Sequence, residues 1–266
     1  MDIIGELING TRARPKEAIA EKNADYIADL ARKQGEAGVR FVDVNPGTTG
    51  DAEISDMKWL VETAQSATDK ALSFDSPNVR AVEAAFEVYT GSQLPLINSI
   101  TFEQEKLEAL LGLVVDTGAN VVALAMGDDG MPADGRQRQE TAVRLIDRLT
   151  SAGVAVERIY VDPVIAPLGT CHETGAHVLS AIRSIAEQCP QCHITCGLSN
   201  ISFGLPNRKL VNRVFLSQCM VAGLDSAIMD PLERDTMAEL AAAEALLGND
   251  EWCMNYITLS RSGAIG

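Results

Sequence analysis

Acid and amide side chains recur where short apolar runs of this chain end. These strand ends carry almost only acids and amides. No lysine or histidine is among them, and the one serine lies next to Asn200. The residues are Glu6, Asn9, Asp43, Asn45, Asp75, Asn98, Asp162, Asn200 and Asp230. A carboxylate accepts two parallel hydrogen bonds, and a carboxamide both donates and accepts. Such a set suits a flat heterocycle with several N–H groups and a carbonyl, and a pterin presents that edge.

The same inventory argues against other chemistries. A Schiff-base aldolase needs a lysine on a strand, and a zinc hydrolase needs grouped histidine or cysteine ligands. The apolar runs offer neither. Cys189 and Cys192 form a C-x-x-C pair, but no second pair with matching spacing follows, and one pair is only half of a tetrahedral site. We therefore predict no bound metal.

A purely local role competes with ligand binding at these positions. Asp and Asn also cap helices and close turns, and proline follows soon after Asp75, Asp162 and Asp230. For any one of these residues, a capping or turn role is as strongly expected as a ligand-binding role. A ligand site is favoured only if several of these side chains converge on one place.

The apolar runs alternate along the chain with segments whose apolar residues recur at three and four. Their starts lie 23 to 38 residues apart, the length of a strand, a helix and their loops, which is typical of βα units in a parallel sheet. The expected strands are Ile3 to Ile8, Val39 to Asn45, Ala71 to Asp75, Leu94 to Asn98, Asn120 to Met126, Arg158 to Asp162, His193 to Ser199 and Ser226 to Met229.

Eight such units predict an α/β fold, most simply a (β/α)8 TIM barrel that occupies residues 1–266 as a single domain. An open, doubly wound sheet shares this pattern. However, the first turn, Gly5 to Gly10, lacks the G-x-G-x-x-G spacing of that fold. In a barrel the carboxyl ends of the strands form the mouth that carries the active site. The polar strand ends would therefore meet there.

The charge and composition of the chain limit the kinds of partner that it is expected to bind. The chain has 22 basic and 37 acidic residues, a net charge of −15, which disfavours nucleic acid and anionic membrane surfaces. Its apolar runs have the length of strands and are too short to span a membrane, and its first residues do not resemble a secretory signal. Six cysteines are too sparse for a disulfide scaffold. We expect a soluble, cytoplasmic protein.

Several motifs in order along the chain resemble those of one family. They are Ile4 to Gly10, Asp43-Val44-Asn45, Asp75-Ser76-Pro77-Asn78, Ile97-Asn98-Ser99, Asp162-Pro163, Gly197 to Ser202, and Asn207-Arg208 leading to Asn212-Arg213. Each motif is weak alone, but the series covers nearly the whole chain. The chain resembles the methyltetrahydrofolate:corrinoid methyltransferases. These are pterin-binding barrels related to the folate module of cobalamin-dependent methionine synthase.

This resemblance implies roles for particular residues. The pyrimidine edge of the pterin would be held by Asp75, Asn98 and Asp162, while Gly197 and Ser199 line its bed. Asn200 would reach N5, and Arg208 would lie near the bound folate. Further possible contributors are Glu6, Asn9, Asp43, Asn45, Met126, Ile201 and Phe203.

The implied reaction moves a methyl group between N5 of tetrahydrofolate and the cobalt of a corrinoid (cobalamin). An amide has no useful acidity, so Asn200 would stabilise the transition state while the proton arrives through water. Tetrahydrofolate and 5-methyltetrahydrofolate would be the substrates. The Asp-x-His-x-x-Gly pattern of corrinoid carriers is absent, so the corrinoid must come on a partner protein. The family also suggests a homodimer.

Alternatives remain open at this point. The methyl group could move in either direction through the same site. A dihydropteroate synthase-like enzyme shares the barrel, although no strand-end lysine supports that activity here, and a non-catalytic folate-binding or docking subunit is a third possibility. Phe203 to Pro206 is less polar than the matching segment of acetogen-type enzymes. The loop from Gly127 to Arg138 is either a lid, a docking surface or simply a solvated loop, and the last is favoured.

Overall fold

The computed structural model describes residues 1–128 and 130–265, so Asp129 of the loop from Gly127 to Arg138 lies outside the described residues. Eight parallel strands form one sheet in the order β7-β6-β5-β4-β3-β2-β1-β8. The strands are β1 (Asp2–Asn9), β2 (Phe41–Asn45), β3 (Ala71–Asp75), β4 (Leu96–Ile100), β5 (Asn120–Leu124), β6 (Ile159–Asp162), β7 (His193–Ile194) and β8 (Ser226–Met229).

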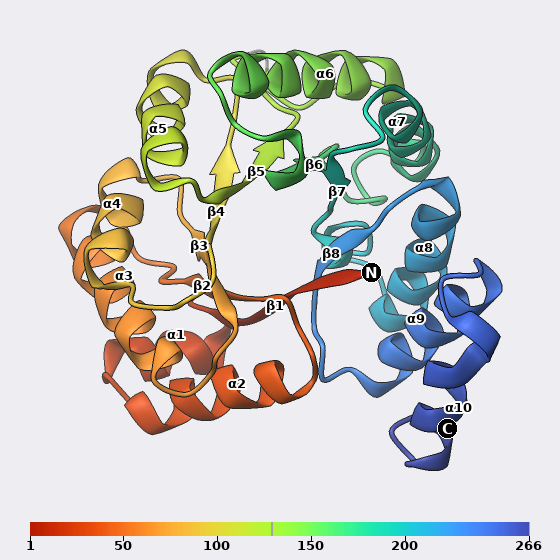
Figure 1. Ribbon diagram of the computed structural model, residues 1–266, viewed down its shortest axis with the longest axis horizontal. Coiled ribbons are helices and arrows are strands. Elements are labelled where there is room, and N and C mark those ends of the chain that lie inside the picture. Colours follow the sequence, from red (N-terminus) through yellow and green to blue (C-terminus); the bar gives the residue numbers. More distant parts are fainter. Residues whose placement is uncertain (129, 266) are drawn as a thin grey trace.

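The sheet closes on itself between its two end strands. A parallel bridge joins Gly197 to Ile228, and the Asp225 backbone N–H donates to the Ile194 carbonyl oxygen at 3.3 Å. The strands therefore form a ring, with the helices arranged around its outside (Figure 1). The predicted (β/α)8 barrel is confirmed.

The outer layer consists of helices that turn an apolar stripe toward the strands, except α10, which contacts α9 and has no buried residue. They are α1 (Ala13–Ala20), α2 (Ala24–Glu36), α3 (Gly50–Gln65), α4 (Val79–Val88), α5 (Gln104–Thr117), α6 (Gly135–Ser151), α7 (Thr174–Gln188), α8 (Arg208–Ala222), α9 (Arg234–Leu246) and α10 (Met254–Arg261). In α3 the stripe is Met57, Leu60, Val61 and Ala64, all fully buried. This spacing of three and four residues places one helix face against the sheet.

Apolar side chains fill the barrel near the amino ends of its strands. Ile4, Phe41, Ala71, Leu96, Val122 and Tyr160 form a separate buried cluster there. The Tyr160 hydroxyl donates to Asp2 at 3.1 Å, and its ring stacks on His193. Because this end is packed shut, only the carboxyl end of the barrel is available for a site.

Strands β3 and β8 match the predictions at both ends, whereas the other six differ at one end or both. Strand β4 extends beyond Asn98 to Ile100, and β5 ends at Leu124 rather than Met126. Strand β7 ends at Ile194, and the residues predicted to extend it instead form a 3₁₀ turn at Leu198–Asn200. The Asn200 N–H donates to the Gly197 carbonyl oxygen at 3.1 Å, so a local turn replaces sheet pairing.

Candidate active site

The polar groups at the barrel mouth stand on adjacent strands at matching levels. Asp75 on β3 pairs in register with Asn98 on β4, and Asp43 on β2 pairs with Ser73 on β3. Side chains two residues apart on a strand point to the same face, so Ser73 and Asp75 both face the barrel interior. Sheet register thus gathers side chains that are more than 20 residues apart in the sequence.

A buried carboxylate fixes the orientation of the Asn98 amide. Asp43 is 1% exposed, and its Oδ1 accepts hydrogen bonds from Ser73 Oγ at 2.6 Å and from Asn98 Nδ2 at 3.3 Å. The amide nitrogen of Asn98 is therefore occupied. Its oxygen has no partner among the described residues, so Asn98 presents an acceptor to a ligand.

Asn45 fixes Asp75 in a similar way. Asn45 Nδ2 donates to Asp75 Oδ2 at 2.7 Å, and Asn45 Oδ1 accepts the backbone N–H of Gly47 at 2.8 Å. Both ends of the Asn45 amide are thus occupied within the protein. Within the described part of the chain, Asp75 Oδ1 has no partner and remains free to accept a hydrogen bond.

Asp162 lies on the other side of the mouth, at the end of β6, and is 7% exposed. Its carboxylate accepts the backbone N–H of Val164 at 2.8 Å and also that of Gly197. A carboxylate has about four lone-pair sites, so acceptor capacity remains. Gly197 also supports Asn200, since a Cβ on that glycine would lie 3.0 Å from Asn200 Nδ2.

Burial shifts the titration of these acids. It raises the pKa of Asp75 to about 6, together with the charge on Glu53, against the hydrogen bond from Asn45. Burial likewise raises the pKa of Asp162 to about 6, against its two backbone donors. The pKa of Asp43 lies well above its ordinary value because of burial and the charge on Asp75. At neutral pH, Asp75 and Asp162 are therefore ionised acceptors.

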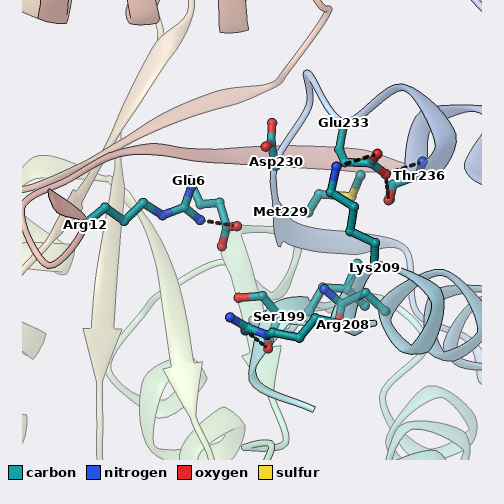
Figure 2. A pocket seen from close by; sticks show the side chains of 11 residues that line it. Glu6, Arg12, Ser199, Arg208, Lys209, Met229, Asp230, Glu233 and Thr236 are labelled. Atoms are coloured by element: carbon teal, nitrogen blue, oxygen red, sulfur yellow. Dashed lines mark hydrogen bonds and ion pairs between the residues drawn. The ribbon is translucent and has the colours of Figure 1, made fainter. Parts of the chain in front are cut away.

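A pocket of about 370 Å³ lies between β1, β8 and the start of α8, and its lining includes none of Asp43, Asp75 and Asp162. Glu6 and Arg12 stand on one side of it, and Arg208 and Lys209 on the other (Figure 2). Arg12 pairs with Glu6 at 2.5 Å, and Lys209 pairs with Glu233 at 3.2 Å. Burial raises the pKa of Glu6, and the charge on Glu6 in turn contributes to the raised pKa of Asp43. The pocket and the strand-end acids are thus electrostatically connected.

Arg208 differs from the other cations of this pocket. Its Nε donates to Ser202 Oγ at 3.1 Å and its Nη2 donates to the Ser199 carbonyl oxygen at 2.8 Å. Both partners are neutral. Its guanidinium also lies 5.7 Å from the centre of the Phe203 ring. Arg208 therefore brings a positive charge to the mouth while its hydrogen bonds go to uncharged oxygens.

The remaining predicted residues lie further from these acids or make local bonds. Asn9 accepts from the backbone N–H of Thr11 at 2.9 Å. Met126 lines a second pocket of about 580 Å³, which also includes parts of the loop from Gly127 to Arg138. Ile201 is 1% exposed and belongs to the core, whereas Phe203 is 65% exposed.

The local-turn alternative also holds for some acids. Asp162 accepts the N–H of Val164, as described above, and Asp230 accepts that of Leu232 at 2.8 Å. Asp75 makes no such turn, since its bond goes to Asn45 on the neighbouring strand. Asp230 both closes this turn and lines the pocket of about 370 Å³.

Sequence reasoning missed three supporting residues. Ser73 holds Asp43, Ser202 holds Arg208, and Arg12 pairs with Glu6. The period of two along strands would have found Ser73, because it is two residues before Asp75. The other two lie in irregular segments, where no periodicity indicates which way a side chain points.

Fold, strand register and motif order together place the chain in a known family. A model of the pterin binding enzyme family matches residues 5–230, and the chain belongs to this family. Among its relatives is the methylcorrinoid:tetrahydrofolate methyltransferase of Eubacterium limosum, which is 37% identical over 100% of this chain and 98% of the relative. Methionine synthase of Mycobacterium tuberculosis is 31% identical over 85% of this chain, but the match covers only 20% of that protein.

Solved structures of low sequence identity share the fold. Dihydropteroate synthase of Xanthomonas albilineans has a TM-score of 0.70 at 16% identity, with 94% of this chain and 92% of that chain covered. The Yersinia pestis enzyme has a TM-score of 0.67 at 16% identity, covering 93% of this chain and 94% of that one. At such identities the likeness concerns the barrel alone.

The described residues contain neither a membrane-spanning helix nor a cluster of metal ligands. None of the helices in residues 1–128 and 130–265 is long and apolar enough to cross a membrane. Within the same residues, no three His, Cys, Asp or Glu side chains are grouped so that they could hold a metal ion. The C-x-x-C pair instead makes a local bond, in which Cys192 Sγ donates to the Cys189 carbonyl oxygen at 3.0 Å.

Proposed function

We propose that this protein transfers a methyl group between N5 of tetrahydrofolate and the cobalt of a corrinoid carried on a partner protein. One observation carries the proposal: the free polar atoms of Asp75, Asn98 and Asp162 at the mouth are all hydrogen-bond acceptors. The pyrimidine edge of a reduced pterin offers N–H donors on its 2-amino group and N3, and the fused reduced pyrazine ring adds the N8–H donor. The two sets are complementary.

The E. limosum relative supports the choice of reaction within the family. Its name combines a methylcorrinoid with tetrahydrofolate, and its match spans the whole of this chain. The corrinoid would supply the cobalt that gives up or accepts the methyl group. Either direction of transfer uses the same site.

Asn200 is the residue we assign to N5. Its side chain is exposed at the mouth and lies over Gly197, whose N–H donates to Asp162. This arrangement supports the assignment, because the Asn200 amide has no competing side-chain partner in the described residues. A carboxamide cannot protonate N5, so it stabilises the changing charge there while water delivers the proton.

Arg208 and the pocket of about 370 Å³ complete the proposal. Ser199 and Arg208, which we assign to the folate site, both line this pocket, so the part of folate beyond the pterin would have room there. Glu6, Ser199 and Arg208 would border it. We further propose a cytoplasmic location and a homodimer, in keeping with the family resemblance and the sparse cysteines.

Folate affinity should depend on pH, because the ligand requires ionised acceptors. Asp75 and Asp162 each have a pKa of about 6, so lowering the pH below 6 protonates them and removes acceptor sites. We expect the dissociation constant for tetrahydrofolate to be flat above pH 7 and to rise by up to about tenfold per pH unit for each group below 6. Fluorescence titration in anaerobic buffers measures this. A constant affinity from pH 5 to pH 8 would contradict the assignment.

Asp43 should affect folate binding only through Asn98. Asp43→Ala frees the Asn98 amide to rotate, and we expect about tenfold weaker tetrahydrofolate binding, since a misdirected buried polar group costs about 1–3 kcal/mol. In an Asn98→Ala background the same change should add nothing. Asp43→Asn, which keeps an acceptor oxygen, should restore most of the affinity. Full additivity of the two alanine changes would show that Asp43 acts independently.

A single-turnover reaction tests the proposed function. The protein is mixed anaerobically with methylcobalamin and tetrahydrofolate, and separately with cob(I)alamin and 5-methyltetrahydrofolate, and the products are followed by absorbance and chromatography. We expect transfer in at least one direction. Folate binding without transfer, even when a methylated corrinoid protein replaces methylcobalamin, would favour a non-catalytic subunit. Condensation of a pterin pyrophosphate with p-aminobenzoate would favour a dihydropteroate synthase-like enzyme.

A further inference from the structure

Val164, two residues after Asp162, has a backbone conformation that valine rarely adopts. Its φ angle is 61°, in the left-handed region, where a β-branched residue is a genuine outlier. Such a conformation persists only when the surrounding structure holds it in place. Val164 is 7% exposed, so its backbone N–H and carbonyl need partners within the protein. These partners indicate what keeps the turn after β6 in its shape.

Both backbone polar groups of Val164 are bonded to side chains. Its N–H donates to Asp162 Oδ1 at 2.8 Å, and its carbonyl oxygen accepts from Arg138 Nε at 3.1 Å. The turn is thus held on one side by the carboxylate that we assign to the pterin and on the other side by a guanidinium. A change at Arg138 can therefore reach Asp162 through a single residue.

Arg138 is a buried cation whose hydrogen bonds go to backbone carbonyl oxygens. It is 1% exposed, and its Nη1 donates to the carbonyl oxygens of Pro132 at 3.0 Å and Asp134 at 2.9 Å. Burial lowers the pKa of Arg138, against the charges of Cys171 and Asp134, and a guanidinium remains charged in proteins. Burying a charge is unfavourable unless it is well bonded, so an apolar side chain would serve better if this position only filled space.

The same guanidinium joins two loops of the barrel mouth. Pro132 and Asp134 belong to the loop from Gly127 to Arg138, which follows β5, whereas Val164 follows β6. The Asp134 side chain also caps α6, because its Oδ1 accepts the backbone N–H of Gln137 at 2.8 Å. Arg138 thus connects the capped start of α6 to the turn beside Asp162. This residue of the loop is buried and bonded rather than solvated.

We propose that Arg138 is a positioning residue for Asp162, because it holds the turn at Val164 so that the Val164 N–H stays on the carboxylate. The proposal rests on the proposed function, which assigns Asp162 to the pterin edge. Without Arg138, we expect the turn to relax to a negative φ and to withdraw the N–H. The carboxylate would then lose one of its two backbone donors and turn away from the ligand.

The titration of Asp162 reports on this turn. Burial raises the pKa of Asp162 to about 6, against the backbone N–H groups of Val164 and Gly197, so loss of the Val164 donor should raise that pKa further. Among the described residues, Cys196 interacts with Asp162 from beyond β7. A hydrogen bond to Cys219 and burial raise the pKa of Cys196 well above its ordinary value, so this thiol stays neutral while Asp162 titrates.

Arg138→Met removes the guanidinium and keeps an unbranched side chain in its place. We expect the pKa of Asp162 to rise by about one pH unit, because a hydrogen bond to a charged group is lost. Tetrahydrofolate binding near pH 6 should then be about fivefold weaker than in the wild type, since less of Asp162 is ionised. NMR of the isotopically labelled Asp162 carboxyl group in the ligand-free protein measures the pKa, and anaerobic fluorescence titration measures the affinity.

The double variant Arg138→Met with Val164→Gly separates positioning from packing. Glycine adopts a positive φ without steric cost, so the turn should keep its shape without the guanidinium. We expect the titration of Asp162 and the folate affinity to return most of the way to the wild-type values. A purely structural role of Arg138 predicts the opposite, because Val164→Gly removes further apolar atoms from a buried position.

Arg136→Met is the matched control. The Arg136 side chain lies two residues earlier on α6, is 80% exposed and pairs with Glu140 at 2.7 Å, so its loss should leave both measurements unchanged. Circular dichroism and thermal unfolding check that each variant is folded. If Arg138→Met does not fold, Arg138→Lys takes its place, and we expect a smaller shift in the same direction because a compact ammonium cannot reproduce the planar fork.

Two results would overturn the positioning role. One is an unchanged Asp162 titration in the folded Arg138 variant, and the other is a shift that Val164→Gly does not reverse. A wild-type protein that binds no tetrahydrofolate would instead overturn the proposed function. The NMR comparison needs no folate, so it decides the role of Arg138 in either case.

Discussion

Asn200→Ala should lower the rate of methyl transfer by about 100- to 1,000-fold, the usual cost of removing one preorganised group that acts in the transition state. The affinity for tetrahydrofolate should change little. The reason is that the pterin edge is held by Asp75, Asn98 and Asp162, whose free acceptors do not involve Asn200. An interaction that strengthens only as charge changes at N5 contributes to rate and not to ground-state binding.

Single-turnover rates and equilibrium titration separate these two quantities. Asn9→Ala is a suitable control, because that amide also stands at the mouth but is bonded to the backbone and hydroxyl of Thr11. It should leave the rate within a few-fold of wild type. Equal losses of rate and affinity in Asn200→Ala would mean that Asn200 simply binds the ring.

Asp75→Asn should weaken tetrahydrofolate binding by about 1–3 kcal/mol, or roughly 5- to 150-fold. Asp75 Oδ2 accepts the Asn45 amide at 2.7 Å, so the free oxygen is the one left for the ligand. An asparagine can keep only one acceptor oxygen, and its NH₂ group would then face either Asn45 Nδ2 or the ligand's N–H. In either case two donors oppose each other.

Calorimetry of tetrahydrofolate binding measures this loss. The control is Asp51→Asn, because the Asp51 side chain is 92% exposed at the start of α3 and pairs with Arg80 rather than with a residue of the proposed site. It should not alter the affinity. Unchanged binding in Asp75→Asn would show that Asp75 does not contact the ligand. Circular dichroism shows whether a variant that has lost binding is still folded.

Much of this architecture could be predicted from the sequence, for identifiable reasons. Parallel strands buried on both faces have nearly continuous apolar sequences, and runs such as Ala71–Asp75 and Ser226–Met229 were located to the residue. The acids that close these runs interrupt an otherwise apolar segment, which makes them visible. Their meeting at one mouth then follows from the parallel arrangement of the strands.

The hydrogen-bond partners could not be predicted in the same way. Asn45 and Asp75 are 30 residues apart, and their bond depends on the register between β2 and β3. The sequence also gives Asn45 and Asn98 the same chemistry, yet only Asn98 keeps a free oxygen, because Asn45 Oδ1 is occupied by the N–H of Gly47. The predicted strand β7 continues to Ser199 because Leu198 is apolar, but Leu198 is buried from a 3₁₀ turn rather than from a strand.

The most direct test of the central claim is a crystal structure of the protein with 5-methyltetrahydrofolate. We predict that the pterin lies in the barrel mouth with its N–H edge on Asp75, Asn98 and Asp162 and with the Asn200 amide within hydrogen-bond distance of N5. The account would be contradicted by a pterin bound outside the mouth, or by one whose N–H groups face solvent while these three side chains bond only to each other.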